Sequence, residues 1–248
     1  MTRKILNQFV IITGICLLFS CESNVLNLDD ERFVNFVTNP SEQDLNMYWK
    51  NPENQNYYTF SRLKDQLAAN DITLIFAANG GMFTNTYAPQ GLYIEHGEVH
   101  SEIDRMQEGY GNFYMQPNGV FYITKMKEAK VTTTNEFELA EEIEYATQSG
   151  PMLLIDGEIH AAFNEGSKNL NIRNGVGILP NGDILFAMSK TPINFFDFAT
   201  YFKDNGCKNA LYLDGLVSRT YLPSINWIPT DGKFGVIIGV TEPKQIEP

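Results

Sequence analysis

The residues best suited to chemistry lie in the stretch Asn209 to Tyr221, where an apolar strand ends in an acid. Four residues of strand character, Ala210 to Leu213, run directly into Asp214, and Gly215 follows. A rigid strand end can hold a carboxylate at the lip of a pocket, and a glycine lets a substrate or another chain approach closely. The alternative interpretation is an ordinary Asp-Gly turn. The choice depends on whether other polar strand ends converge on Asp214.

A second strand end of this kind follows the apolar run Ile72 to Ala78. Such a continuous run is expected of a strand that is covered on both faces. It opens into Asn79, Gly80 and Gly81, and two consecutive glycines can turn the backbone sharply and present N–H groups to an anion. By contrast, we interpret Asp156 as a hairpin residue, because it joins two short strands through Gly157.

Composition limits the classes of function. The chain has 30 acidic and 18 basic residues and a formal net charge of -12, which argues against non-specific binding of nucleic acid. The three histidines, His96, His100 and His160, form no HExxH or HxH pattern, so we expect no metal site of the zinc type and no required cofactor. A structural Ca²⁺ held by carbonyls and one or two Asp would leave little trace in a sequence.

The first residues resemble a bacterial lipoprotein signal. Arg3 and Lys4 precede an apolar run from Phe9 to Phe19, and a small residue then leads into Cys21. We therefore predict a signal peptide over 1–20, a lipidated Cys21 at the start of a tether over 21–30, and a domain over 31–248. The protein would be exported and held in the bacterial envelope, in contact with the membrane only through its lipid. The alternative is a plain secretory peptide in which Cys21 is incidental.

The remaining pattern predicts a single α+β domain with a mixed or antiparallel sheet, many hairpins and about three packed helices. Hairpins are expected where paired short strands flank turn residues such as Asn181-Gly182. Helices are expected over 59–69, 135–145 and 194–204, and residues 40–56 are interpreted as a loop. A further hairpin is predicted between 112–115 and 119–124.

Seven glycine-rich segments occur in an order that resembles the phosphodiester glycosidase family, and its bacterial branch in particular. The resemblance covers roughly 74–240. The segments are NGGMF (79–83), GLYIEHG (91–97), GNF (111–113), PNGVFYI (117–123), TQSGPML (147–153), RNGVGI (173–178) and LYLDGLVS (211–218).

The resemblance implies hydrolysis of the bond between a sugar's anomeric carbon and the oxygen of a phosphodiester, with a phosphodiester-linked carbohydrate as the partner. Asp214, in the Leu-Asp-Gly motif, would act at the anomeric carbon as nucleophile, as base for water or as an electrostatic stabiliser. Arg173, in the Arg-Asn-Gly motif, would bind the phosphate in a fork geometry. The substrate-binding residues implied by the other motifs are Asn79, Gly80, Gly81, Gln148, Ser149, Asn174 and Ser218.

Two features remain open at this point. Glu95 and Asp104 are candidates for a second carboxylate, although a hairpin tip and a solvated loop describe them equally well. After Leu-Asp-Gly, many relatives continue with Gly and Ser, whereas this chain has Leu216 and Val217. These bulkier residues bear on which sugar fits, and Arg219 is either a second phosphate ligand or a surface residue.

Three classes of function compete. The first is the glycosidase, and the second is a non-catalytic glycan-binding lipoprotein with the same fold. The third is a phosphoesterase that cuts the P–O bond, against which the lack of a His-rich or Asp-rich metal cluster counts. The sequence does not specify the sugar, the aglycone, the stereochemical outcome or the oligomeric state.

Overall fold

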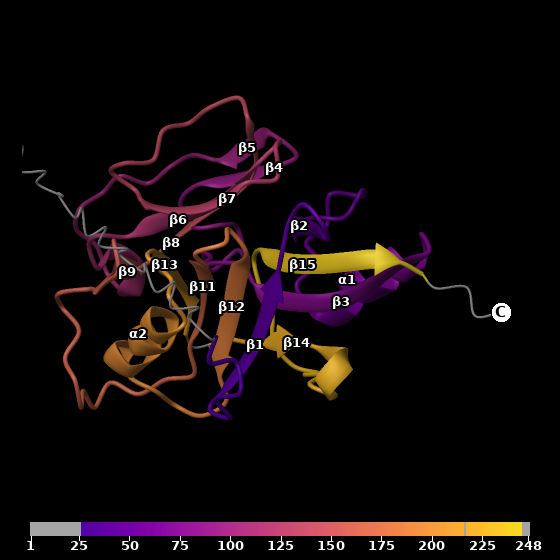
Figure 1. Cartoon of the computed structure of the whole chain (residues 1–248). Helices are drawn as coiled ribbons and strands as arrows, with labels where there is room; N and C mark the ends of the chain where they lie inside the picture. Colours follow the sequence, from indigo (N-terminus) through magenta and orange to yellow (C-terminus); the bar gives the residue numbers. More distant parts are fainter. Residues whose placement is uncertain (1–25, 216, 245–248) are drawn as a thin grey trace, which may run out of the picture.

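Three antiparallel sheets and two α-helices build the part of the chain that the computed structural model describes, residues 26–215 and 217–244 (Figure 1). This confirms the predicted α+β class. The expected single sheet is instead three sheets, and the described residues contain two α-helices and two short 3₁₀ helices rather than about three packed helices.

The largest sheet has six strands in the spatial order β1-β12-β11-β13-β9-β10. All of its neighbouring strands pair antiparallel. Its strands are β1 (Phe33–Thr38), β9 (Met152–Ile155), β10 (Glu158–Ile159), β11 (Asn174–Ile178), β12 (Ile184–Ser189) and β13 (Ala210–Asp214).

Two smaller sheets complete the β-structure. The four-stranded sheet has the order β14-β3-β15-β2, with β2 (Asp44–Tyr48), β3 (Ile72–Asn79), β14 (Thr220–Tyr221) and β15 (Ile237–Pro243). The five-stranded sheet has the order β5-β4-β8-β6-β7, with β4 (Tyr93–Glu95), β5 (Glu98–Ser101), β6 (Gly119–Thr124), β7 (Ala129–Thr133) and β8 (Ile143–Ser149).

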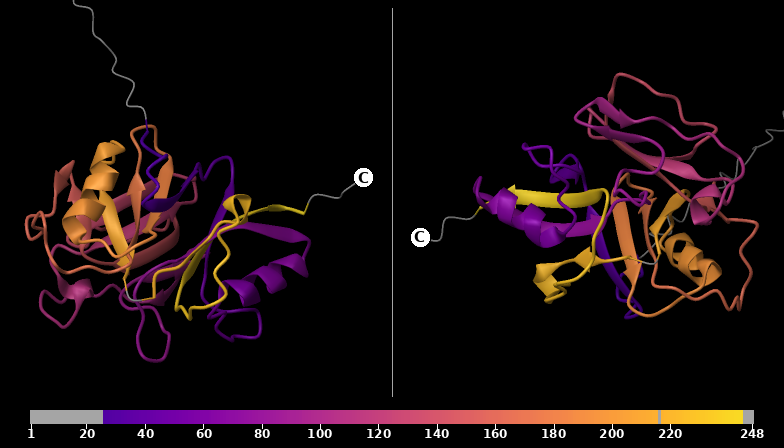
Figure 2. Two further views of the ribbon diagram at one scale, coloured as in Figure 1. Left: turned by 90° about the horizontal axis from the view of Figure 1, so that it is seen from below. Right: turned by 180° about the vertical axis from the view of Figure 1, so that it is seen from behind.

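Both helices begin at a side-chain cap and bury an apolar stripe. In α1 (Phe60–Ala68), Thr59 accepts from the N–H of Arg62, and in α2 (Phe195–Asp204), Asn194 accepts from the N–H of Asp197. The helices lie on opposite sides of the molecule (Figure 2). The predictions over 59–69 and 194–204 are thereby confirmed.

The core joins the three sheets. Its largest buried cluster takes Val34 and Phe186 from the first sheet, Phe76 from the second, and Phe121 and Tyr145 from the third. The end of the apolar run, Phe76 to Asn79, is buried on both faces, because Phe76 and Ala78 reach this cluster and Ala77 reaches a smaller one beneath α1, whereas Thr73 near the start of β3 is exposed. The ends of strands from different sheets are therefore held rigidly against one another.

Three local predictions are wrong. Residues 135–145 are not a helix: Ile143–Ser149 form β8, because this segment alternates β-branched and aromatic residues and pairs with both β6 and β4. Residues 112–115 form the 3₁₀ helix η1 (Asn112–Tyr114) instead of a hairpin strand. Within the expected loop over 40–56, β2 pairs with β15.

Two turns predicted from the sequence are present in the structure. Asp156, at φ +50°, joins β9 to β10 as a hairpin residue, and the turn at Asn181-Gly182 joins β11 to β12. The predicted signal peptide and Cys21 lie outside the described residues and stay predictions, as does Leu216. No helix within 26–215 and 217–244 has the length and apolar character required to cross a membrane.

Replacing Leu63 by Ala should test the smaller core beneath α1. Leu63 is fully buried there against Phe60 and Phe234, so the change should lower the free energy of unfolding by about 2–5 kcal/mol. Lys64→Ala, one residue along and exposed, should change it by less than about 0.5 kcal/mol. Urea denaturation measures both, and equal effects of the two changes would contradict the assigned packing of α1.

Candidate active site

Four of the predicted site residues meet where strands of two sheets end. Asn79 ends β3, Asn174 begins β11 and Asp214 ends β13, and Ser218 lies in the turn that follows. All four are buried. The pairing of β11 with β13 shifts register next to Asn174, so that Asn174 lies directly opposite Asp214. The convergence that the sequence left open is therefore present for this group.

Two hydrogen-bond donors hold the Asp214 carboxylate, and no cation of the described residues pairs with it. Asn79 Nδ2 donates to its Oδ2 at 3.0 Å, and the Gly215 N–H donates to its Oδ1 at 2.6 Å. Burial raises the pKa of Asp214 to about 7, and these two hydrogen bonds lower it only in part. A carboxyl group with such a pKa can serve as an acid or as a base near neutral pH.

Asn79 is oriented by its other contacts. Its Oδ1 accepts from Asn174 Nδ2 at 3.0 Å and from the Arg219 N–H at 3.0 Å. An amide oxygen with two donors fixes the amide nitrogen on the opposite side, toward Asp214. Asn174 Nδ2 also donates to the Asn79 main-chain oxygen at 2.9 Å, so the two asparagines bind the ends of two sheets together.

The turn after Asp214 closes back on it. Ser218 donates its N–H to the Gly215 carbonyl at 3.0 Å and its hydroxyl to the Asp214 carbonyl at 2.8 Å. A Cβ at Gly215 would lie 2.0 Å from the Tyr212 hydroxyl, so only glycine fits there without displacement. The Asp-Gly pair therefore belongs to a tightly packed turn rather than to a solvated hairpin.

Arg173 lies on the other side of Tyr212 and does not touch Asp214. Its guanidinium stacks on Phe195 at 3.6 Å and donates to the carbonyls of Ile193 at 2.8 Å and Asn169 at 3.0 Å, and to the Tyr212 hydroxyl at 3.4 Å. Burial lowers the pKa of Arg173. Among the described residues no carboxylate pairs with it. It is therefore a fully buried cation whose charge no described carboxylate neutralises.

Tyr212 contacts Arg173 and lies two residues before Asp214, and it is not among the site residues predicted from the sequence. Its hydroxyl accepts from Arg173 and lies against Gly215. Arg173 lowers its pKa and Asp214 raises it, while burial is the largest influence and raises it further. Its position two residues before Asp214 in a strand was the only available signal, since alternate residues share a face.

Gln148 and Ser149 belong to the framework and not to the Asp214 cluster. Gln148 Oε1 accepts from the N–H groups of Leu92 and Asp104, and its Nε2 donates to Asp104 and Thr134. The side-chain amide is saturated by the protein and is not placed to position sugar hydroxyls. Ser149 Oγ donates to the Leu213 carbonyl at 2.9 Å and so supports the strand that carries Asp214.

The expected anion cradle at Gly80 is wrong. The Gly80 N–H donates to the Val236 carbonyl at 2.8 Å, so it is used within the fold. A Cβ at this position would lie 2.8 Å from Ile238 Cγ1, which explains the glycine by close packing. Gly81 has φ +153°, a conformation that L side chains rarely adopt, and a Cβ there would lie 2.8 Å from Thr147 Oγ1.

Neither candidate for a second carboxylate joins Asp214. Glu95 accepts from the Tyr93 hydroxyl at 2.7 Å and lines a separate pocket with Trp49 and His100. Asp104 accepts from the Tyr114 hydroxyl at 2.9 Å and from the Met106 N–H. No group of three or more His, Cys, Asp or Glu residues is arranged to hold a metal ion within the described ranges.

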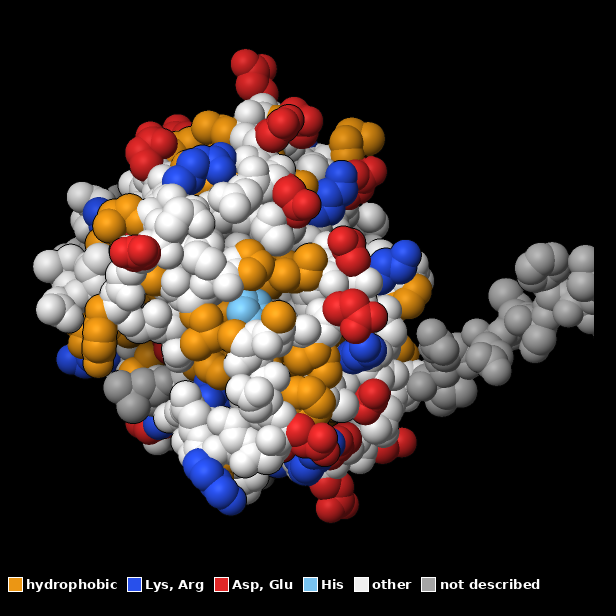
Figure 3. All heavy atoms as spheres, turned by 90° about the vertical axis from the view of Figure 1, so that its left-hand side faces the viewer, with side chains coloured by type: hydrophobic (Ala, Val, Ile, Leu, Met, Phe, Trp, Pro, Cys, Tyr) orange, Lys and Arg blue, Asp and Glu red, His pale blue; other side chains and the backbone are white. Residues whose placement is uncertain are grey.

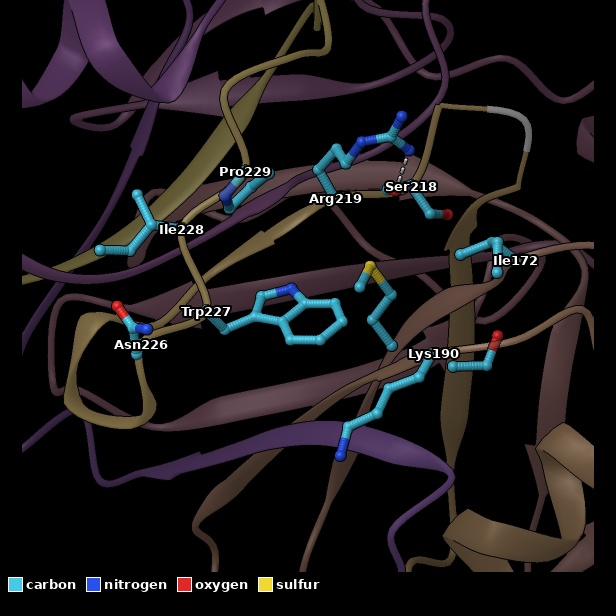
Figure 4. A pocket seen from close by; sticks show the side chains of 10 residues that line it. Ile172, Lys190, Ser218, Arg219, Asn226, Trp227, Ile228 and Pro229 are labelled. Atoms are coloured by element: carbon cyan, nitrogen blue, oxygen red, sulfur yellow. Dashed lines mark hydrogen bonds between the residues drawn. The ribbon is translucent and has the colours of Figure 1, made fainter.

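A pocket of about 360 Å³ adjoins the Asp214 turn at Ser218 (Figure 4). Trp227 projects into it, between Arg219 on one side and Lys190 on the other. Arg219 is already engaged, because its guanidinium pairs with Asp231 and donates to the Ser218 carbonyl. The lining residues are Ile172, Met188, Ser189, Lys190, Ser218, Arg219, Asn226, Trp227, Ile228 and Pro229.

A known protein family matches the part of the chain that contains these site residues. The family model for phosphodiester glycosidases matches residues 73–241, a range that contains Asn79, Arg173, Asn174 and Asp214. The chain belongs to the phosphodiester glycosidase family. The uncharacterized protein YigE of Escherichia coli (strain K12) is 35% identical over 188 residues, which cover 75% of this chain and 73% of YigE.

Solved structures show the same fold at low identity. The catalytic domain of zebrafish N-acetylglucosamine-1-phosphodiester alpha-N-acetylglucosaminidase, auto-inhibited by its pro-peptide, superposes with a TM-score of 0.56 at 16% identity, over 87% of this chain and 85% of that one. A protein from Burkholderia pseudomallei K96243 superposes with a TM-score of 0.55 at 11% identity, over 84% and 73% of the two chains. At such identities the likeness concerns the fold alone.

The raised pKa predicts how stability depends on pH. The unfolded chain ionises Asp214 near 3.8, whereas the folded chain keeps its proton up to about pH 7. The unfolded state therefore binds fewer protons between these values, and the free energy of unfolding falls as pH rises through this range. Asp214→Asn lacks this fall. We expect the Tm of the variant, relative to wild type, to increase from pH 4 to pH 7 and then to level off; parallel Tm profiles would contradict the assignment.

Proposed function

We propose that this phosphodiester glycosidase hydrolyses the C–O bond between a sugar's anomeric carbon and the phosphate of a sugar-1-phosphodiester. The products are the free sugar and a phosphomonoester. The observation that carries the proposal is the buried Asp214 carboxylate, which has hydrogen-bond donors from Asn79 and Gly215 but no cation. Such a group is well suited to meet the positive charge that develops at an anomeric carbon.

In this mechanism Asp214 acts in its ionised form. The phosphomonoester that departs is a good leaving group, so protonation of its oxygen is not demanded. The carboxylate attacks the anomeric carbon, or removes a proton from a water that does so, while the bond from that carbon to the phosphate oxygen breaks and the phosphomonoester leaves with the bonding electrons. Asn79 keeps the reacting carboxylate oxygen in position. Asn174 and Ser218 act as positioning residues, because their contacts are with Asn79 and with the Asp214 backbone.

Arg173 would receive the phosphate. Its guanidinium is buried and stacked, and it donates to two carbonyls, the Asn169 side chain and the Tyr212 hydroxyl. These partners hold the charge in place without neutralising it, so a bound phosphate oxygen would gain a strong charge-assisted hydrogen bond. The Tyr212 hydroxyl lies between this cation and the Asp214 turn, and a substrate spanning the two groups would pass over it.

The surface charge fits a single-phosphate ligand better than a polyanion. Acidic side chains are scattered over the face seen in Figure 3, and the cationic ones there form no continuous patch. With a net charge of -12, a phosphate is best recognised by one enclosed cation. We further propose that Cys21 anchors the protein to a membrane of the bacterial envelope, where it would meet phosphodiester-linked carbohydrate.

Hydrolysis of a sugar-1-phosphodiester in ¹⁸O-labelled water tests the bond that breaks. We expect the label to enter the sugar and not the phosphate, because water attacks carbon. Asp214→Asn should lower kcat by at least about 10³-fold without a matching rise in KM, whereas a glycan-binding protein would keep most of its affinity and show no turnover to lose. Label found only in phosphate would contradict the proposal and indicate a phosphoesterase.

The pH dependence separates the two roles open to Asp214. If its ionised form acts, kcat/KM should rise with pH and level off above the pKa of about 7. A general acid would give the opposite limb, with kcat/KM falling above that pH. Measurement of initial rates from pH 5 to 9 distinguishes them, and a falling limb would exclude the nucleophile and base roles.

A further inference from the structure

The pocket beside Ser218 has no assigned role in hydrolysis. Its volume of about 360 Å³ lies in the range of small-molecule sites. Five of its lining residues are apolar: Ile172, Met188, Trp227, Ile228 and Pro229. Neither Asp214 nor Arg173 lines it, so the pocket is distinct from the two groups assigned to the sugar and the phosphate.

The indole of Trp227 is held in place at the pocket. Trp227 and Leu222 exchange main-chain hydrogen bonds at 2.8 and 3.1 Å, which close the segment that carries the indole. The indole packs partly against the central core, and Figure 4 shows it extending across the pocket floor. Ile228 and Ile225 are 51% and 56% exposed, so an apolar surface continues outward from the indole.

The charged residues that line the pocket are all basic. Although the chain has 30 acidic residues, none lines the pocket, whereas Lys190 and Arg219 do. Arg219 is neutralised by Asp231. Lys190 forms no ion pair with any described residue; it is near enough to Asp30 to lower that carboxyl's pKa, but Asp30 is paired with Arg32. An uncompensated cation therefore stands beside an apolar cavity.

We propose that this pocket binds a single-chain amphiphile with an anionic head, its apolar chain against Trp227 and Ile228 and its head at Lys190. The apolar walls favour the chain, and the charge of Lys190 favours an anion over a cation of the same size. Ser218 belongs to both the pocket and the Asp214 turn, which makes this a second ligand site next to the first. The proposal goes beyond hydrolysis and does not depend on it.

Decyl phosphate, kept below its critical micelle concentration, is the probe. Calorimetry on the wild-type protein should show binding, together with a blue shift of tryptophan emission that Trp227→Phe abolishes. Decyltrimethylammonium should bind at least about tenfold more weakly, and inorganic phosphate should not bind. Failure of decyl phosphate to bind, or equal affinity for the cationic chain, would overturn the proposal whatever the hydrolytic activity.

Substitutions at exposed residues of the pocket test whether the amphiphile binds there. Ile228→Asp and Lys190→Glu should each weaken decyl phosphate binding at least about tenfold, while Lys64→Glu, the same charge change on α1, should not. Both pocket residues are exposed, so the thermal unfolding of these variants should match wild type. Unchanged affinity in both pocket variants would show that the amphiphile binds elsewhere and would contradict the assignment.

Discussion

The candidate site depends on a buried carboxylate, Asp214, with which no cation in the described part of the chain forms an ion pair. Burial of an ionised carboxyl is costly unless donors surround it, and Asp214 has two: the Asn79 amide and the Gly215 N–H. Asn79 can donate in this direction only because Asn174 and the Arg219 N–H occupy its oxygen. The polar contacts that set the state of Asp214 are thus the same contacts that join the ends of β3, β11 and β13. A change that disturbs these contacts would therefore affect both the packing of the strand ends and the ionisation of Asp214.

The second buried charged group is Arg173, which shares no hydrogen bond with Asp214. Arg173 is held by carbonyls and by aromatic rings, and Tyr212 separates it from Asp214. Had the two charges formed an ion pair, the carboxylate would have a lowered pKa and the cation would be neutralised. Because the two charges are kept apart, neither one neutralises the other. This separation is what a sugar-1-phosphodiester requires, since its reacting carbon and its phosphate are adjacent but distinct.

The sequence predicted those features that local rules control. Continuous apolar runs, Asp-Gly turns and capped helices identified β3, the turn at Asp156 and both helices. The ordered motifs assigned Asn79, Asn174, Asp214 and Ser218 to the site, and these four lie together. The same motifs also assigned Arg173, Gln148, Ser149, Gly80 and Gly81, which make their contacts outside this cluster. Long-range pairing was not predicted: the helix expected over 135–145 included the start of β8, because local sequence does not show that this segment pairs with β4 and β6. Gln148 and Gly80 were assigned to substrate because nothing local shows that their amide groups are already saturated by Leu92, Asp104 and Val236.

Membership of the phosphodiester glycosidase family gives the reaction class its context, and the chemistry proposed here rests on the state of Asp214. That state can be measured without substrate. A ¹³C NMR titration of the carboxyl carbons, with Asp214→Asn to assign the resonance, reports the pKa of this group directly. The account predicts ionisation near pH 7, and a lower pKa would follow if a cation reached the carboxylate. Ionisation at the ordinary value, near pH 4, would contradict the central claim that Asp214 is buried without a counter-charge.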